Sequence, residues 1–179
     1  MAIGTGITIE EFESLPDALA HNHELVNGEL VDVSGNTPYH NFIRDLLIES
    51  LAPLVREQKL GKLISEQECD FDGNAHGPDV ALIGAAKVHL IDLNRRVQLV
   101  VPDLAMEIVS QNDKFQSVMG KADRYRKCGT KEAWLLAPGT RQACVQTEDR
   151  QAFLSEDQKF ESTLIPGFAI RLADLFDSV

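Results

Sequence analysis

The chain has 179 residues, 44% of them hydrophobic, which is enough for one folded domain over residues 1–179 with a single sizeable core. Its 17 Lys and Arg residues stand against 28 Asp and Glu residues, and the net charge of -11 argues against nonspecific binding to nucleic acid. No apolar run reaches the roughly 18 residues that cross a bilayer, and three widely spaced cysteines indicate neither a disulfide framework nor a zinc site, so we expect a soluble cytoplasmic protein.

The first predicted elements are a short helix and a β-hairpin. Thr8 and Glu11 fit a capping box, in which each side chain satisfies an exposed backbone amide, and Pro16 ends this helix. Residues 23–33 form two strand-like runs around Asn27-Gly28, a dipeptide that favours the positive φ angles of a type I′ turn. The pattern predicts an N-terminal helix and hairpin ahead of the main fold.

A long helix and a strand are predicted next. Apolar residues recur every three or four positions over residues 38–56, which is typical of an amphipathic helix. Residues 63–71 alternate between two sets of side chains, and this two-residue period predicts a strand with one wetter face.

The second half of the chain predicts further strands around one helix. Strands are expected over residues 78–84, 104–110 and 131–137, and a helix over 114–128 that suits a right-handed crossover between parallel strands. Short strands and a helical turn at 172–176 follow. This order predicts an α+β, α/β-like domain with a mixed central β-sheet flanked by helices.

Two acids occupy positions where a carboxylate is costly. Asp79 follows Pro78 in one strand-like run, and Glu107 interrupts an otherwise apolar one. Burying a carboxylate is unfavourable unless a cation or hydrogen bonds compensate it. If the two strands are neighbours, both acids could hold one divalent metal ion, with Mg²⁺ or Mn²⁺ expected for oxygen ligands. Alternatively, Asp79 bonds backbone amides at a strand entry, and Glu107 faces solvent on an edge strand.

A series of motifs recurs in order along nearly the whole chain. They are residues 24–30 (ELVNGEL), 38–40 (PYH), 78–81 (PDVA), 102–110 (PDLAMEIVS), Lys121, Tyr125, Gly129 and 132–136 (EAWLL). Together they resemble the Uma-two family of restriction-endonuclease-like proteins, within the PD-(D/E)XK nuclease superfamily. The resemblance implies a restriction-endonuclease-like core in which Asp79 and Glu107 match the metal-binding acids, Glu24 an additional acid and His40 a helix-opening histidine.

The lysine departs from the superfamily motif. That motif places it two residues after the second acid, where this chain has Val109. The resemblance therefore implies that the catalytic cation has migrated to Lys121, and Lys114 on the same helix flank is a second candidate. Two further departures are Ser117 and Ala137, where the family usually carries acids.

The function implied is that of a Mg²⁺- or Mn²⁺-dependent phosphodiesterase acting as a DNA endonuclease. The competing hypothesis is a catalytically degenerate nuclease fold that serves as a binding or assembly module, for example as a homodimer. For two residues a purely structural role competes with a role in the site. His40 could bond exposed backbone amides at a helix start, and Glu24 could be a cross-strand partner in the hairpin. Trp134 is expected in the core.

Overall fold

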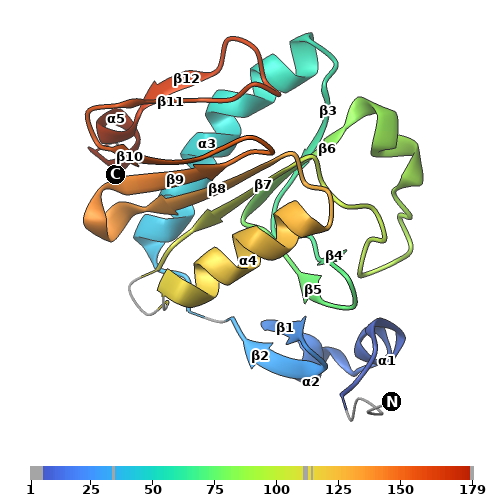
Figure 1. Ribbon diagram of the computed structural model, residues 1–179. Coiled ribbons are helices and arrows are strands. Elements are labelled where there is room, and N and C mark those ends of the chain that lie inside the picture. The colour runs from blue at the N-terminus through green and yellow to red at the C-terminus, as the bar shows by residue number, and fades with distance from the viewer. Residues whose placement is uncertain (1–5, 34, 111–112, 114, 178–179) are drawn as a thin grey trace.

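The computed structural model of the chain describes residues 6–33, 35–110, 113 and 115–177. A six-stranded sheet runs through the middle, with strand order β10-β9-β8-β7-β6-β3 (Figure 1). Its strands are β3 (Gly61–Ile64), β6 (Val80–Gly84), β7 (Leu104–Ile108), β8 (Glu132–Ala137), β9 (Gln142–Gln146) and β10 (Gln151–Ser155). Among these six described strands, only β7 and β8 pair in parallel, and helix α4 (Phe115–Lys127) connects them, which confirms the predicted mixed sheet and crossover.

The two faces of this sheet carry different helices because side chains alternate along each strand. Helix α3 (Pro38–Glu57) buries Ile43, Leu47 and Leu51 in a large core cluster that includes Met106 and Ile108 of β7. Helix α4 lies on the other face, where its Tyr125 joins a buried cluster with Ala105. Glu107 shares the face of Ala105, so β7 directs this acid toward α4.

A smaller four-stranded sheet, in the order β2-β1-β5-β4, stands beside the central one. Its strands are β1 (His23–Val26), β2 (Glu29–Asp32), β4 (Cys69–Asp70) and β5 (Ala75–His76), with helices α1 (Ile9–Glu13) and α2 (Asp17–Ala20) preceding them. The predicted hairpin is confirmed, since Asn27 and Gly28 adopt φ angles of 53° and 82° at its turn. The capping box of Thr8 and Glu11 is confirmed as well.

The chain from residue 63 to residue 71 corrects one prediction. It is not a single strand, because β3 ends at Ile64 and β4 begins at Cys69 in the other sheet. Glu66 adopts a φ of 54° between them, and its amide donates to the Pro78 carbonyl. Side-chain alternation continues on both sides of this turn, which is why the period alone indicated one element. Pro16 is also the N-cap of α2, whereas α1 already ends at Glu13.

The C-terminal segment packs into the core between helix α3 and the central sheet. It contains β11 (Lys159–Glu161), β12 (Ala169–Arg171) and α5 (Leu172–Asp177), and two short 3-10 helices occur earlier at Ala85–Leu90 and Pro138–Thr140. Trp134 is fully buried there, with its ring centroid 4.1 Å from that of Phe160 and 5.7 Å from that of Phe168. Within the described ranges, no helix is both long and apolar enough to cross a membrane.

Trp134→Ala is expected to lower the free energy of unfolding by about 3–5 kcal/mol, because it leaves a cavity between the aromatic rings. Chemical denaturation monitored by circular dichroism measures this loss. Phe153→Ala is the matched control, since 61% of Phe153 is exposed and its removal leaves no buried cavity. Equal stability losses for the two variants would contradict the assignment of Trp134 to the core.

Candidate active site

The pairing of β6 with β7 brings the two conspicuous acids together. Val80 lies opposite Met106 in this antiparallel pair, so Asp79, just before β6, lies beside Glu107. The Ile108 amide donates to Asp79 Oδ2 at 2.7 Å, and both acids are only 8% exposed. The expectation that their strands are neighbours is confirmed. The edge-strand alternative for Glu107 is wrong, because β7 lies between β6 and β8.

Asp79 also contacts the first turn of helix α3. His40 Nε2 lies 3.2 Å from Asp79 Oδ1, and both side chains are buried. Burial disfavours the charged imidazole, but the Asp79 carboxylate outweighs this and raises the pKa of His40. The helix is capped by the Thr37 side chain, which accepts from the His40 amide. The His40 imidazole therefore contacts an acid of the site and does not cap the helix.

Glu107 receives its contacts from helix α4. The Tyr125 hydroxyl donates to Glu107 Oε1, and Lys121 Nζ lies 3.7 Å from Glu107 Oε2. Burial raises the pKa of Glu107 to about 8, and the nearby charges of Asp79 and Glu24 act in the same direction against the opposing effect of Lys121. The buried site therefore favours the protonated form of Glu107, and a cation bound beside it would favour the carboxylate.

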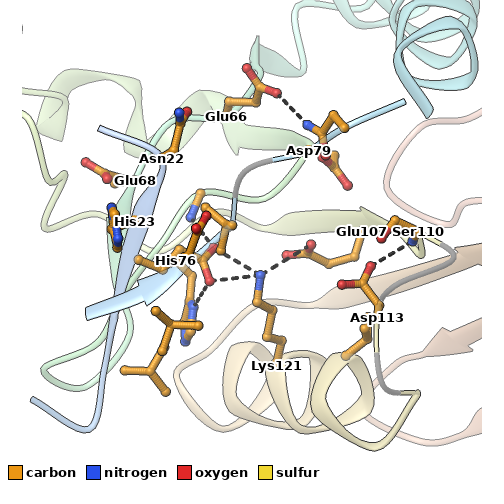
Figure 2. A pocket seen from close by; sticks show the side chains of 18 of the residues that line it. Asn22, His23, Glu66, Glu68, His76, Asp79, Glu107, Ser110, Asp113 and Lys121 are labelled. Atoms are coloured by element: carbon orange, nitrogen blue, oxygen red, sulfur yellow. Dashed lines mark hydrogen bonds and ion pairs between the residues drawn. The ribbon is translucent and has the colours of Figure 1, made fainter. Parts of the chain in front are cut away.

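Lys121 is fixed mainly by Glu24 of strand β1. Its Nζ lies 3.0 Å from Glu24 Oε1 and 2.9 Å from Oε2, and Figure 2 shows the same ammonium joined to Glu107 by a dashed line. Burial opposes the charged form, but these carboxylates outweigh it and raise the pKa of Lys121. Lys121 is thus a permanent cation at neutral pH.

Glu24 accepts from three different groups. Besides Lys121, the Gly77 amide donates to its Oε1 at 3.1 Å, and His76 Nδ1 lies 2.9 Å from its Oε2. Burial opposes ionisation, yet His76 and Lys121 outweigh it and lower the pKa of Glu24 to about 2. Glu24 is therefore more than a cross-strand partner in the hairpin. Its lone pairs are already engaged by donors, so it is better suited to hold Lys121 than to bind a metal ion.

These side chains line one cavity of about 1140 Å³ between the small sheet, helix α4 and the end of the central sheet where β6 begins and β7 ends. Asp79, Glu107, Lys121, Glu24 and His40 all contribute to its wall. Lys114, the second candidate for the lysine, lies outside the described residues.

The residues at positions that depart from the family motif carry no charge that could replace the missing lysine or acid. Val109, which occupies the superfamily's lysine position, packs against the apolar cluster under α4. Ser117 also lines the cavity wall, on the same helix as Lys121.

Three residues of the site were not assigned from the sequence. His76 and Arg124 belong to none of the motifs described above, and Tyr125 was named only as one member of the motif series. The structure joins them to Glu24, His76 and Glu107 respectively. A signal existed for Tyr125 alone, because it lies four residues after Lys121 and hence on the same helix flank.

The donor chemistry fits Mg²⁺ or Mn²⁺. Among the described residues, no cluster of three or more His, Cys, Asp or Glu side chains is arranged as a ligand set. Mg²⁺ does not need one, since it commonly binds through one or two carboxylates and completes its shell with water and substrate phosphate. Asp79 and Glu107 could supply those two carboxylates.

Comparison with known families decides the class of the protein. The model of the Uma2 family, described as "putative restriction endonuclease", matches residues 9–173. The chain belongs to the Uma2 family. This confirms the family inferred from the sequence motifs, and the match covers both the acids and Lys121.

Solved structures confirm the fold of this Uma2 protein. The crystal structure of a protein described as a putative nuclease belonging to DUF820, from Anabaena variabilis ATCC 29413, superposes with a TM-score of 0.84. The alignment covers 96% of this chain and 98% of that chain at 21% sequence identity, which establishes the shared fold. No curated protein matches the chain.

Proposed function

We propose that the protein is a Mg²⁺- or Mn²⁺-dependent phosphodiesterase that acts on DNA as an endonuclease. The observation that carries this proposal is the meeting of Asp79, Glu107 and Lys121 at one side of a single cavity. Two carboxylates and one ammonium are the groups that hold a metal ion and stabilise a phosphate at the same time. Membership of a family of restriction-endonuclease-like proteins supports the nuclease class.

Each residue has a distinct part in the proposed reaction. A bound metal ion would polarise the phosphodiester and lower the pKa of a coordinated water. Asp79, oriented by His40 and the Ile108 amide, and Glu107, oriented by Tyr125, would be its protein ligands. The raised pKa of Lys121 favours a charged ammonium that stabilises the phosphate over a neutral amine that removes a proton from water.

The decisive assay offers the purified protein supercoiled plasmid, linear duplex DNA, single-stranded DNA and RNA, each with Mg²⁺, Mn²⁺ or a chelator. We expect metal-dependent cleavage of DNA, and nicking of the circular plasmid would establish internal cuts. If RNA alone is cleaved, the substrate is assigned wrongly. If no nucleic acid is cut with either metal ion, the enzymatic proposal fails.

The net charge of -11 favours the competing hypothesis of a noncatalytic module. Calorimetric titration with Mn²⁺ separates the two hypotheses without a substrate. A metal site predicts saturable binding that disappears in Glu107→Ala. No binding, or binding that this substitution leaves unchanged, supports the module.

Metal binding by the wild-type protein should become tighter as the pH rises toward about 8, the pKa to which burial raises Glu107. Below that value the carboxyl group must lose a proton before it can bind the ion, so proton release opposes binding. Mn²⁺ titrations in buffers of different ionisation enthalpy would count the released proton. An affinity that is equal on both sides of this pH would contradict Glu107 as a ligand.

A further inference from the structure

A chain of hydrogen bonds leads from the hairpin turn to Lys121, and the proposed reaction does not explain its first members. We infer that His76 is a positioning residue that holds Glu24 against Lys121, and that Arg124 keeps the His76 imidazole in the tautomer that this contact requires. The effect on catalysis rests on the proposed function, whereas the contacts themselves can be tested without it.

The His76 ring is held rigidly at the end of β5. It is 1% exposed, and it packs against Tyr125 in a T-shaped arrangement with 5.8 Å between ring centroids and an interplanar angle of 74°. Its Nδ1 atom lies 2.9 Å from Glu24 Oε2. The imidazole therefore approaches Glu24 in one fixed direction.

Arg124 decides which ring nitrogen of His76 carries the proton. Arg124 Nη1 lies 3.2 Å from His76 Nε2, and a guanidinium group can only donate hydrogen bonds. Nε2 must therefore accept, so the neutral ring carries its proton on Nδ1 and donates it to Glu24. Arg124 Nη2 is itself held by the Asn27 side-chain oxygen at 3.2 Å, in the turn of the hairpin.

The electrostatic surroundings support a neutral ring. Burial lowers the pKa of His76, and the cations Lys121 and Arg124 add to this effect against the opposing charge of Glu24. A protonated imidazole would also turn a second N–H toward the guanidinium. Neutral His76 thus donates one hydrogen bond to Glu24 without competing with Lys121 for its negative charge.

Glu24 transmits this constraint to the proposed catalytic cation. Oε2 is shared by His76 and Lys121, whereas Oε1 is shared by the Gly77 amide and Lys121. Loss of the His76 contact leaves Oε2 bound to the mobile Lys121 ammonium alone, with the Gly77 amide on Oε1 as the remaining fixed donor. The carboxylate can then rotate about that contact and carry Lys121 away from Glu107. The cost should fall on turnover, because the ligands Asp79 and Glu107 are untouched.

Two substitutions at position 76 separate positioning from mere packing. In His76→Asn the amide nitrogen lies near the place of Nδ1 and can still donate to Glu24, whereas in His76→Gln it lies near the place of Nε2 and faces Arg124. We expect His76→Gln to lower kcat about tenfold or more, and His76→Asn to retain kcat within about threefold, with KM unchanged in both. Equal losses, or no loss in either variant, would overturn the inference.

Nuclear magnetic resonance tests the contacts independently of any nuclease activity. The ¹⁵N shifts of the His76 imidazole should identify the Nδ1–H tautomer in the wild-type protein and a mixture of tautomers in Arg124→Met. Lys127→Met is the matched control, because it removes one charge from an exposed position of the same helix. The Lys121 ammonium protons should exchange slowly in the wild type and in His76→Asn, and rapidly in His76→Gln.

The two proposals fail in different ways. An Nε2–H or doubly protonated His76 in the wild type, or Lys121 protons that exchange alike in both His76 variants, overturns the positioning role even if the protein cleaves DNA. The expected spectra from a protein that cuts no nucleic acid leave the contacts standing and overturn the nuclease proposal alone.

Discussion

Glu107→Gln is expected to lower metal-dependent DNA cleavage by about a hundredfold or more while the protein stays folded. The amide keeps the shape of the side chain and can still accept from the Tyr125 hydroxyl, but it cannot supply the negative charge that a divalent ion needs. Plasmid nicking at saturating Mn²⁺ measures the loss. Retained cleavage would show that Glu107 is not a metal ligand.

Unfolding at several pH values provides the control for this variant. Burial raises the pKa of Glu107 from 4.5 to about 8, so the folded state binds the proton more tightly than the unfolded state does. This contribution to stability is fully present below about 4.5 and is lost as the pH rises to about 8. Glu107→Gln lacks that loss, so its stability relative to the wild type should increase with pH over this range.

Lys121→Met should damage both activity and stability. It removes the cation beside Glu107, and it leaves the Glu24 carboxylate, which is only 4% exposed, without its ammonium partner. Breaking a buried ion pair in this way commonly costs about 3–5 kcal/mol of unfolding free energy. Cleavage should fall about a hundredfold or more, because the charge that stabilises the phosphate is gone.

The double variant Lys121→Met with Glu24→Gln separates these two effects. It removes the unpaired charge, so denaturation should show that much of the lost stability returns, whereas cleavage should remain low. Lys114→Met is the comparison for the second candidate lysine. If Lys114→Met abolishes cleavage and Lys121→Met does not, the cation of the site is assigned wrongly.

Much of the fold could be predicted from local patterns. Helices α3 and α4 follow from apolar residues every three or four positions, and the β1–β2 hairpin follows from Asn27-Gly28. These signals are readable because the partners that produce them are a few residues apart. Residues 63–71 were the failure, since alternation says nothing about which sheet a strand joins.

The acids of the candidate site were found for a related reason. A carboxylate in an apolar strand is conspicuous by itself, so Asp79 and Glu107 could be singled out before their partners were known. The motif resemblance added Glu24, His40 and Lys121, but it could not say what each of them touches.

Most helices and strands, the family and the unusual charges could be predicted before the structure was known, because they depend on neighbouring residues and on recurring motifs. The folded chain alone reveals that Glu24, 97 residues from Lys121, holds its ammonium, and that His76, 52 residues from Glu24, holds the carboxylate in turn. Such contacts depend on the order of strands in two sheets and on the direction of each side chain. The free energy that stabilises these contacts comes from the packing of the whole chain, so they cannot be predicted from a local sequence pattern.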